Sequence, residues 1–165
     1  MNAPLIWIGV PLVMAVVLFL LRQRTDLVLA LAVITNLLLA LIAFLLPAGK
    51  PLNLGGILIP VNDSLYILGR QFILVSGDLP FLGLVFAFSA FWFGGGKIAR
   101  VNRYFAPLGM MIMALLVAAL AVEPFLYAAL LVEMAVLFSI PILSPPGEAV
   151  KGGVLRFLVF QTLAM

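Results

Sequence analysis

The sequence predicts an all-α fold, a polytopic membrane helix bundle, and three observations support this prediction. Of the 165 residues, 66% are apolar and only 9% are charged, whereas soluble globular domains contain about 25% charged residues. This composition also excludes an intrinsically disordered chain. The apolar residues form long blocks, and the few charges alternate between the loops that join them. We therefore expect one membrane domain over residues 1–165.

Two apolar blocks open the chain, and a membrane span needs about 20 such residues. Residues 4–21 are the first expected span, which Arg22 and Arg24 bring to an end. The block is longer than the apolar region of a signal peptide, and no small-residue cleavage site follows it, so we expect the span to be retained. Residues 27–46 are the second span, interrupted only by Thr35 and Asn36.

The segment from residue 47 to residue 77 is mixed, and it predicts an extended loop with a short outer β-hairpin. Residues 57–61 and 72–75 have high β-propensity, and Asn62-Asp63-Ser64 is a turn signal between them. The rival is one long helix over residues 64–93. Six residues make a continuous helix unfavourable: Gly69, Arg70, Gln71, Gly77, Asp78 and Pro80.

Three further full spans are expected. The third covers residues 79–93, because Asp78 and Pro80 form a helix start and three glycines follow at 94–96. The fourth covers residues 104–122 and ends at Glu123-Pro124. The fifth covers residues 125–143 and ends where Ser144 precedes two prolines.

A sixth apolar block, residues 154–165, is still apolar at the last residue. Twelve residues make about 18 Å of helix, which does not cross a bilayer. We therefore expect five full spans plus a truncated sixth, in the amino-terminal portion of a longer protein. The alternative is a native protein that ends in a half-span held by a partner.

The basic residues predict the orientation of the bundle. The first, third and fifth loops hold seven of the nine Lys and Arg residues, and the second loop holds the other two. Because cytoplasmic loops are enriched in Lys and Arg, the amino terminus is expected outside. The seven are Arg22, Arg24, Lys97, Arg100, Arg103, Lys151 and Arg156, and the two are Lys50 and Arg70.

The chain contains no Cys and no His. This excludes disulfides, Cys/His metal sites and histidine ligation of haem. No glycine-rich phosphate motif follows a strand. We therefore expect no cofactor and no metal. The net charge of +3 is spread over several loops, so we expect no nucleic-acid partner, and the lipid bilayer is the expected surrounding.

Glu133 is the one acid that the predicted spans place inside the membrane, eight residues into the fifth block. A charged residue there costs about 2.5–3.5 kcal/mol on insertion scales and usually faces a bundle interior or a cavity. Removal from water favours the protonated carboxyl, so Glu133 is the candidate proton-transfer residue. The alternatives are a protonated carboxyl that only hydrogen-bonds another helix, and a helix shifted toward the interface.

Other polar residues could support Glu133, although such residues are more often packing contacts. The candidates are Asp78 at the start of the third span, Arg156 and Gln161 in the sixth block, and also Thr35, Asn36, Ser139 and Thr162. Arg156 is expected to extend toward the cytoplasmic surface.

Four segments together resemble the antiporter-like membrane subunits of respiratory complex I (NADH-quinone oxidoreductase) and the related Mrp-type cation/proton antiporter subunits. They are residues 123–127 (EPFLY), 131–134 (LVEM), 141–143 (PIL) and 147–157 (GEAVKGGVLRF). The resemblance covers about residues 72–165, and residues 65–77 depart from the best-known members.

The resemblance implies a Glu in the fifth helix, which Glu133 matches, and a basic-aromatic start to the sixth, which Arg156 and Phe157 match. It also implies an Asp before the third helix, where Asp78 lies, and an outer hairpin. In that family the Glu pairs with a Lys in a seventh helix that this chain lacks. The implied setting is a bacterial or archaeal plasma membrane, with other membrane subunits as partners and protons or monovalent cations as cargo.

Three functions follow from these observations. The first is a proton-translocating subunit with Glu133 as carrier and no redox centre of its own. The second is a structural membrane subunit that scaffolds a complex. The third, an enzyme acting on lipids, is poorly supported, because a lone intramembrane acid lacks a catalytic partner.

Overall fold

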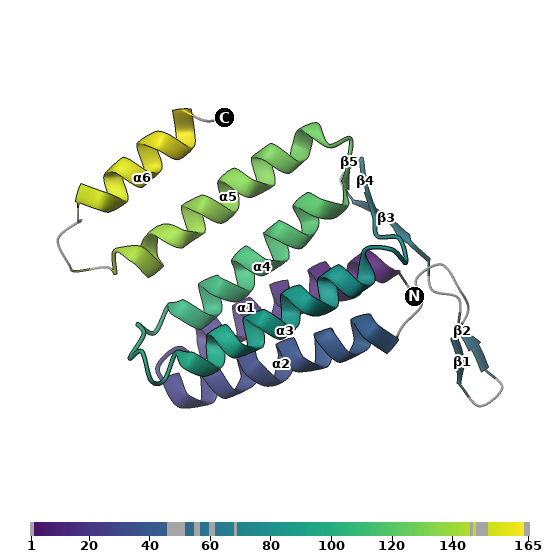
Figure 1. The fold of residues 1–165 in the computed structure, drawn as a ribbon, viewed down its shortest axis with the longest axis horizontal. Coiled ribbons are helices and arrows are strands. Elements are labelled where there is room, and N and C mark those ends of the chain that lie inside the picture. The colour runs from purple at the N-terminus through teal and green to yellow at the C-terminus, as the bar shows by residue number, and fades with distance from the viewer. Residues whose placement is uncertain are drawn as a thin grey trace.

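The computed structural model describes residues 2–45, 52–54, 57–59, 62–67, 69–145, 147 and 152–163. These residues are mostly helical (Figure 1). The first helix begins as a π-helical turn, Leu5–Gly9, and continues as α1, Val10–Leu20. It is followed by α2 (Thr25–Leu45), α3 (Leu79–Gly95), α4 (Phe105–Ala121), α5 (Leu126–Leu143) and α6 (Gly152–Leu163).

The helix boundaries agree with the apolar blocks to within about two residues. The prediction of five full spans is not supported, however. Only α2 and α5 are long and apolar enough, among the described residues, to cross a membrane, and the other helices have 17 residues or fewer. One reason is local: α4 ends at Ala121 because Val122 and Glu123 form a β-strand instead of a further helical turn.

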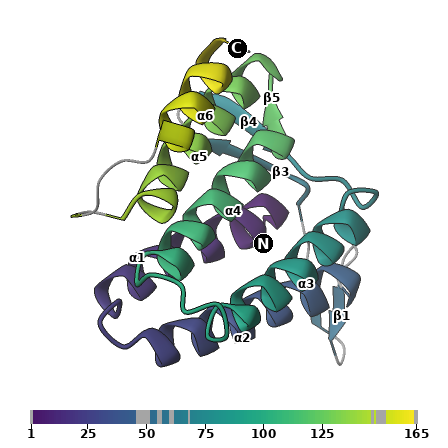
Figure 2. The same ribbon diagram turned by 60° about the vertical axis from the view of Figure 1, so that its left-hand side comes forward.

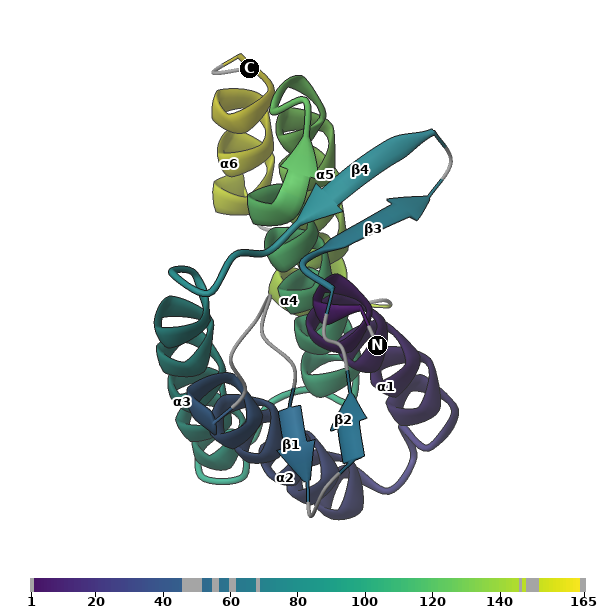
Figure 3. The same cartoon turned by 90° about the vertical axis from the view of Figure 1, so that its right-hand side faces the viewer.

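The strands correct the all-α prediction. β1 (Leu52–Leu54) pairs with β2 (Ile57–Ile59), and β3 (Ser64–Ile67) pairs with β4 (Arg70–Ile73). β4 also pairs with β5 (Val122–Glu123), so a three-stranded antiparallel sheet joins the loop before α3 to the turn after α4. Figure 3 shows both sheets at the end of the bundle where the chain begins.

The predicted hairpin, of residues 57–61 with residues 72–75, does not form, and two shorter hairpins take its place. Residues 57–59 and 70–73 are strands, yet each pairs with a nearer strand and not with the other. The turn between β3 and β4 contains Gly69, whose φ of 73° suits glycine. Asn62, in the expected turn, instead bridges to Asn2 and accepts a backbone hydrogen bond from Ala3.

We call the two ends of the bundle the sheet end and the basic end. The sheet end holds β3, β4, β5 and the start of α5. The basic end holds the α1–α2 turn and the α3–α4 loop, where Lys97 forms a 3.1 Å ion pair with Asp26. The guanidinium of Arg22 there lies 4.3 Å from the Phe19 ring centre and 5.9 Å from that of Tyr104. Figure 2 shows α4 passing between α1 and α5.

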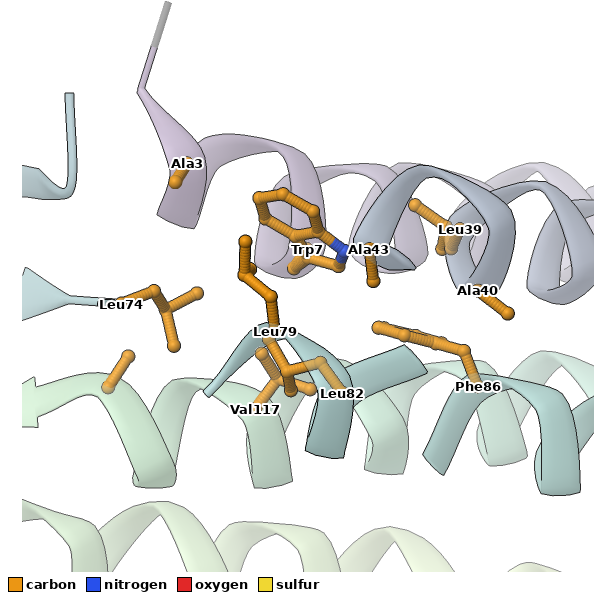
Figure 4. Close-up of a cluster of buried hydrophobic side chains, with 11 residues drawn as sticks. Ala3, Trp7, Leu39, Ala40, Ala43, Leu74, Leu79, Leu82, Phe86 and Val117 are labelled. Carbon is orange, nitrogen blue, oxygen red and sulfur yellow. The ribbon is translucent and has the colours of Figure 1, made fainter. Parts of the chain in front are cut away.

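The core is built largely from small residues. Nearly half of the buried apolar residues in the described part of the chain are alanines, whereas large apolar side chains such as Phe91, Leu130 and Phe160 are exposed. One cluster holds Trp7 between α1, α2 and the start of α3, close to Ala43 and Leu79 (Figure 4). Small residues inside and large apolar residues outside are typical of helices that pack in lipid.

Some predicted features fall outside the described residues. They are residues 46 and 164–165 at the ends of the second and sixth blocks, and the loop residues Lys50, Glu148 and Lys151.

Candidate functional site

The candidate site is centred on Glu133, in the eighth position of α5. At 1.5 Å per residue, its α-carbon lies about 10 Å from the start of the helix. The residues on both sides, from Leu130 to Val136, are otherwise apolar. The helix therefore holds a carboxyl group well away from both of its ends.

Packing against α4 fixes the position of α5. Ala128 and Ala135 are buried, and they lie seven residues apart, which is two helical turns on one face. Ala128 belongs to a cluster with Ala119 and Val122 of the preceding segment. Small side chains let the two backbones approach closely, so α5 has little freedom to rotate the Glu133 side chain relative to α4.

The sheet end fixes where α5 begins. Glu123 of β5 pairs with Gln71 of β4, and the Glu123–Pro124 peptide bond is cis. The guanidinium carbon of Arg70 lies 3.8 Å from the ring centre of Tyr127, in the first turn of α5. The hairpin therefore contacts the helix that carries Glu133.

Glu133 as a residue is half-buried. Its Oε2 atom is buried and accepts no hydrogen bond from the described residues. A buried acceptor without a partner is uncommon in native structures and needs an explanation. Among the described residues, the Oδ1 of Asn36 is a second buried acceptor of this kind.

The other predicted candidates lie apart from Glu133. Asp78 precedes α3 at the sheet end, where its Oδ2 accepts a 3.1 Å hydrogen bond from the Val75 backbone. Arg156 is exposed, one turn into α6 and near the basic end. Gln161 lies nine residues from the start of α6, which places it at about the depth of Glu133, but no hydrogen bond joins the two side chains.

Three of the four remaining candidates donate hydrogen bonds to groups other than Glu133. Ser139 donates to the Val136 carbonyl at 2.6 Å, and Thr162 donates to the Leu158 carbonyl at 2.9 Å. Asn36 is completely buried and donates to Ala32 O at 2.7 Å and to the sulfur of Met110 at 3.0 Å. Thr35 is half-buried on α2. The structure thus brings none of these polar groups to Glu133 within the described residues.

Sequence reasoning missed two polar contacts made by α4. Met110 accepts from Asn36 of α2, and Met113 accepts from the Ser89 hydroxyl of α3 at 3.3 Å. Two methionines three residues apart on one face were visible in the sequence, but methionine in an apolar helix ordinarily indicates packing.

No group of three or more His, Cys, Asp or Glu side chains suited to a metal ion occurs in the residues that the structure describes. No protein-family model, curated protein or solved structure matches this chain.

Proposed function

We propose that the chain is an integral membrane protein whose helices lie across the bilayer, with the sheet end outside and the basic end in the cytoplasm. Two helices of the described part of the chain, α2 and α5, are long and apolar enough to span. Helices α3 and α4 have 17 residues, which is about 26 Å and the lower limit for a span. The exposed large apolar side chains and the alanine-rich interior support this placement.

We further propose that it acts as a proton-translocating, antiporter-like subunit of an NADH-quinone oxidoreductase or a related membrane complex. The observation that carries this proposal is the buried, unpartnered Oε2 atom of Glu133 in an otherwise apolar helix. In a low-dielectric setting, a carboxyl group with a free oxygen can accept a proton from one neighbour and release it to another. Other subunits would supply the second proton site and all redox chemistry.

A structural role is the second candidate, and the exposed surface of α5 and α6 favours it. Leu126, Leu130, Phe160 and Leu163 are all more than half exposed. Such faces contact lipid or neighbouring subunits. In this role Glu133 would hydrogen-bond a neighbouring helix without carrying protons.

The variant Glu133→Gln distinguishes the two roles. Glutamine keeps the size and the hydrogen-bonding capacity but cannot ionise. We expect proton pumping by the complex, isolated from its own membrane and placed in vesicles with a pH-sensitive dye, to fall at least about ten-fold, in line with the effect of removing a proton-transfer group.

Glu123→Gln is the matched control, because Glu123 is exposed at the sheet end. We expect this variant to leave proton pumping unchanged. Assembly of the complex, followed by native gel electrophoresis, should be normal for both variants. Unchanged pumping by an assembled Glu133→Gln complex would refute the proton-carrier role and favour the structural one.

A further inference from the structure

Besides Glu133, two side chains in the described part of the chain have a buried polar atom without a hydrogen-bond partner. They are the indole of Trp7 and the amide of Asn36, and both residues are completely buried. Trp7 presents a donor, its Nε1–H, and Asn36 presents an acceptor, its Oδ1. Each unpaired atom costs free energy in an apolar core, so a donor and an acceptor of this kind need an explanation.

The orientation of the Asn36 amide follows from its neighbours. Its Nδ2 atom lies 2.7 Å from the carbonyl oxygen of Ala32 and 3.0 Å from the sulfur of Met110. Both neighbouring atoms are acceptors, so the amide must present its NH₂ group to them. The opposite orientation would place oxygen against oxygen, and Oδ1 is therefore the free end of the group.

Trp7 and Asn36 meet the same face of α2. On this helix Ala32, Asn36 and Ala43 are all buried, and their spacings of four and seven residues place them on one face. Trp7 belongs to a core cluster with Ala43, and its indole nitrogen lies on the side of the ring toward Ala43 (Figure 4). Asn36 reaches Met110 of α4 from the same face. We call the contact of these five residues the α2 seam.

The α2 seam runs from the sheet end to about the middle of α2. Asn2 and Asn62 lie at the sheet end, where the Asn62 amide donates to the side chain of Asn2 at 3.4 Å. Trp7 follows five residues after Asn2 and packs in the cluster of Ala43. Asn36 lies seven residues from Ala43, about 10 Å along the helix. Polar groups therefore mark the mouth of the seam, an intermediate level and its inner end.

The backbone is irregular at the intermediate level. Leu5–Gly9, with Trp7 at its centre, form a π-helical turn, which is a rare conformation and is frequent at functional sites. The seam is also narrow, because the apolar hollows beside α4, with volumes of about 370 Å³ and 350 Å³, are lined by other residues of α3, α4 and α5. Leu39 lies between the two levels in the cluster of Trp7. A molecule that passes it must be small.

We propose that the α2 seam admits a single file of water from the sheet end as far as Asn36. The Nε1–H of Trp7 donates to this file and Oδ1 of Asn36 accepts from it, when the Leu39 side chain swings aside. Water fits because it both accepts and donates, and buried water typically bridges polar groups that lack another partner. A distance of about 10 Å needs about three water molecules at about 2.8 Å per hydrogen bond. Because protons move along hydrogen-bonded water, the file would connect the outer surface with the middle of the membrane.

Hydroxyl-radical footprinting by X-ray radiolysis tests this proposal, because radicals formed from bound water oxidise the side chains beside it. The protein is placed in lipid nanodiscs, and oxidation of each residue is measured by mass spectrometry. Met110 is completely buried, whereas Met111, at nearly the same depth on α4, is half-buried. Exposure alone therefore predicts faster oxidation of Met111. We expect Met110 to be oxidised roughly five-fold faster than Met111, because water reaches Asn36 beside it.

Four variants separate the file from other causes. Asn36→Leu, which has a similar shape and no acceptor, should lower the oxidation of Met110 to that of Met111, whereas loss of the fold would raise it. Thr35→Val, one residue along α2 and half-buried, should leave it unchanged. Leu39→Ala should raise it by widening the seam. Leu82→Ala, an equal truncation at a buried residue of α3, should not.

Two results would overturn the proposal. Oxidation of Met110 no faster than that of Met111 in the wild type would mean that water does not reach Asn36. Unchanged oxidation of Met110 in Trp7→Phe, which removes the donor, would mean an isolated water molecule in place of a file from the sheet end.

This inference rests on the proposed membrane placement and is independent of proton transfer through Glu133. The Glu133→Gln variant should keep the oxidation of Met110, although its pumping is expected to fall. Loss of pumping in that variant, together with a protected Met110 in the wild type, would support the transport role and refute the seam. The reverse pair of results would support the seam and refute the transport role.

Discussion

Glycine determines how closely individual side chains approach the helix backbones. A Cβ atom at Gly109 of α4 would lie 2.7 Å from the ring of Phe93, and one at Gly83 of α3 would lie 2.8 Å from the ring of Phe44. The Phe93 ring is buried and meets Phe105 edge-on at 5.8 Å, so it has little room to move. Each ring thus occupies the space that a missing side chain leaves, which is how small residues promote close packing between membrane helices.

Gly109→Ala should therefore destabilise the protein. Overpacking against Phe93 costs about 1–3 kcal/mol, and the better helix propensity of alanine returns about 0.5–1 kcal/mol, which leaves a net loss of about 1 kcal/mol. Unfolding of the detergent-solubilised protein by a denaturing detergent would measure it. Gly95→Ala is the control, because a Cβ there meets nothing within 4 Å. Equal stability of the two variants would contradict the close-approach argument.

Polar residues inside apolar helices serve packing more than chemistry in this chain. The sequence marked Asn36 as a candidate neighbour of Glu133, but its amide is engaged by Ala32 and Met110. Ser89 makes a similar pair of contacts, with Val85 O and Met113. The Oδ1 of Asn36 and the Oε2 of Glu133 are both buried without a hydrogen-bond partner in the described part of the chain, and Glu133 differs from Asn36 because its side chain can ionise.

At the scale of elements, the helices were predictable and the strand pairing was not. Charged residues, Pro and Gly interrupt the apolar blocks, and these local signals mark helix ends. The pairing of β4 with β5 joins residues about 50 positions apart, and nothing in two residues of sequence, Val122 and Glu123, indicates such a strand. The same sheet fixes the start of α5, so it also fixes the position of the candidate site.

The contact between Arg70 and Tyr127 should help to hold the β3–β4 hairpin on α5. Tyr127→Leu removes the aromatic face, which at an exposed site is worth about 0.5–1 kcal/mol. We expect backbone amides of β3 and β4 to exchange about two- to five-fold faster, measured by hydrogen exchange with mass spectrometry. Tyr127→Phe should retain most of the protection. Tyr66→Leu is the control, because Tyr66 is exposed on β3. Equal exchange rates in the Tyr127→Leu and Tyr66→Leu variants would refute the proposed role of Tyr127 in holding the hairpin on α5.

At the scale of the whole molecule, the charges sort by end. Arg22, Asp26 and Lys97 come from the first and third loops and meet at the basic end. Arg70, from the second loop, lies at the sheet end with Glu123 and Tyr127. Because consecutive helices run antiparallel, successive loops lie at alternate ends of the bundle. The distribution of Lys and Arg along the sequence predicts the same alternation of loops.

Single-cysteine labelling tests the resulting orientation, because the natural chain has no Cys to remove. Ser76→Cys at the sheet end should react with a membrane-impermeant maleimide added outside. Gln23→Cys and Ile98→Cys at the basic end should react only after the membrane is permeabilised. All three positions are exposed in the protein. Labelling of Gln23→Cys and Ile98→Cys from opposite sides would be incompatible with the bundle.

The sequence by itself determined the helix boundaries and the alternation of basic residues between loops. It also identified Glu133 as the one acid inside a predicted span. Each of these features depends on local composition. Tertiary structure decided which helix faces are buried, how the strands pair, and which side chains line the apolar hollows beside α4. The physical reason is that these helices are apolar on all sides, so hydrophobic periodicity cannot reveal a buried face. Residue size distinguishes the buried face instead, and small and large side chains can complement each other only when two helices pack together.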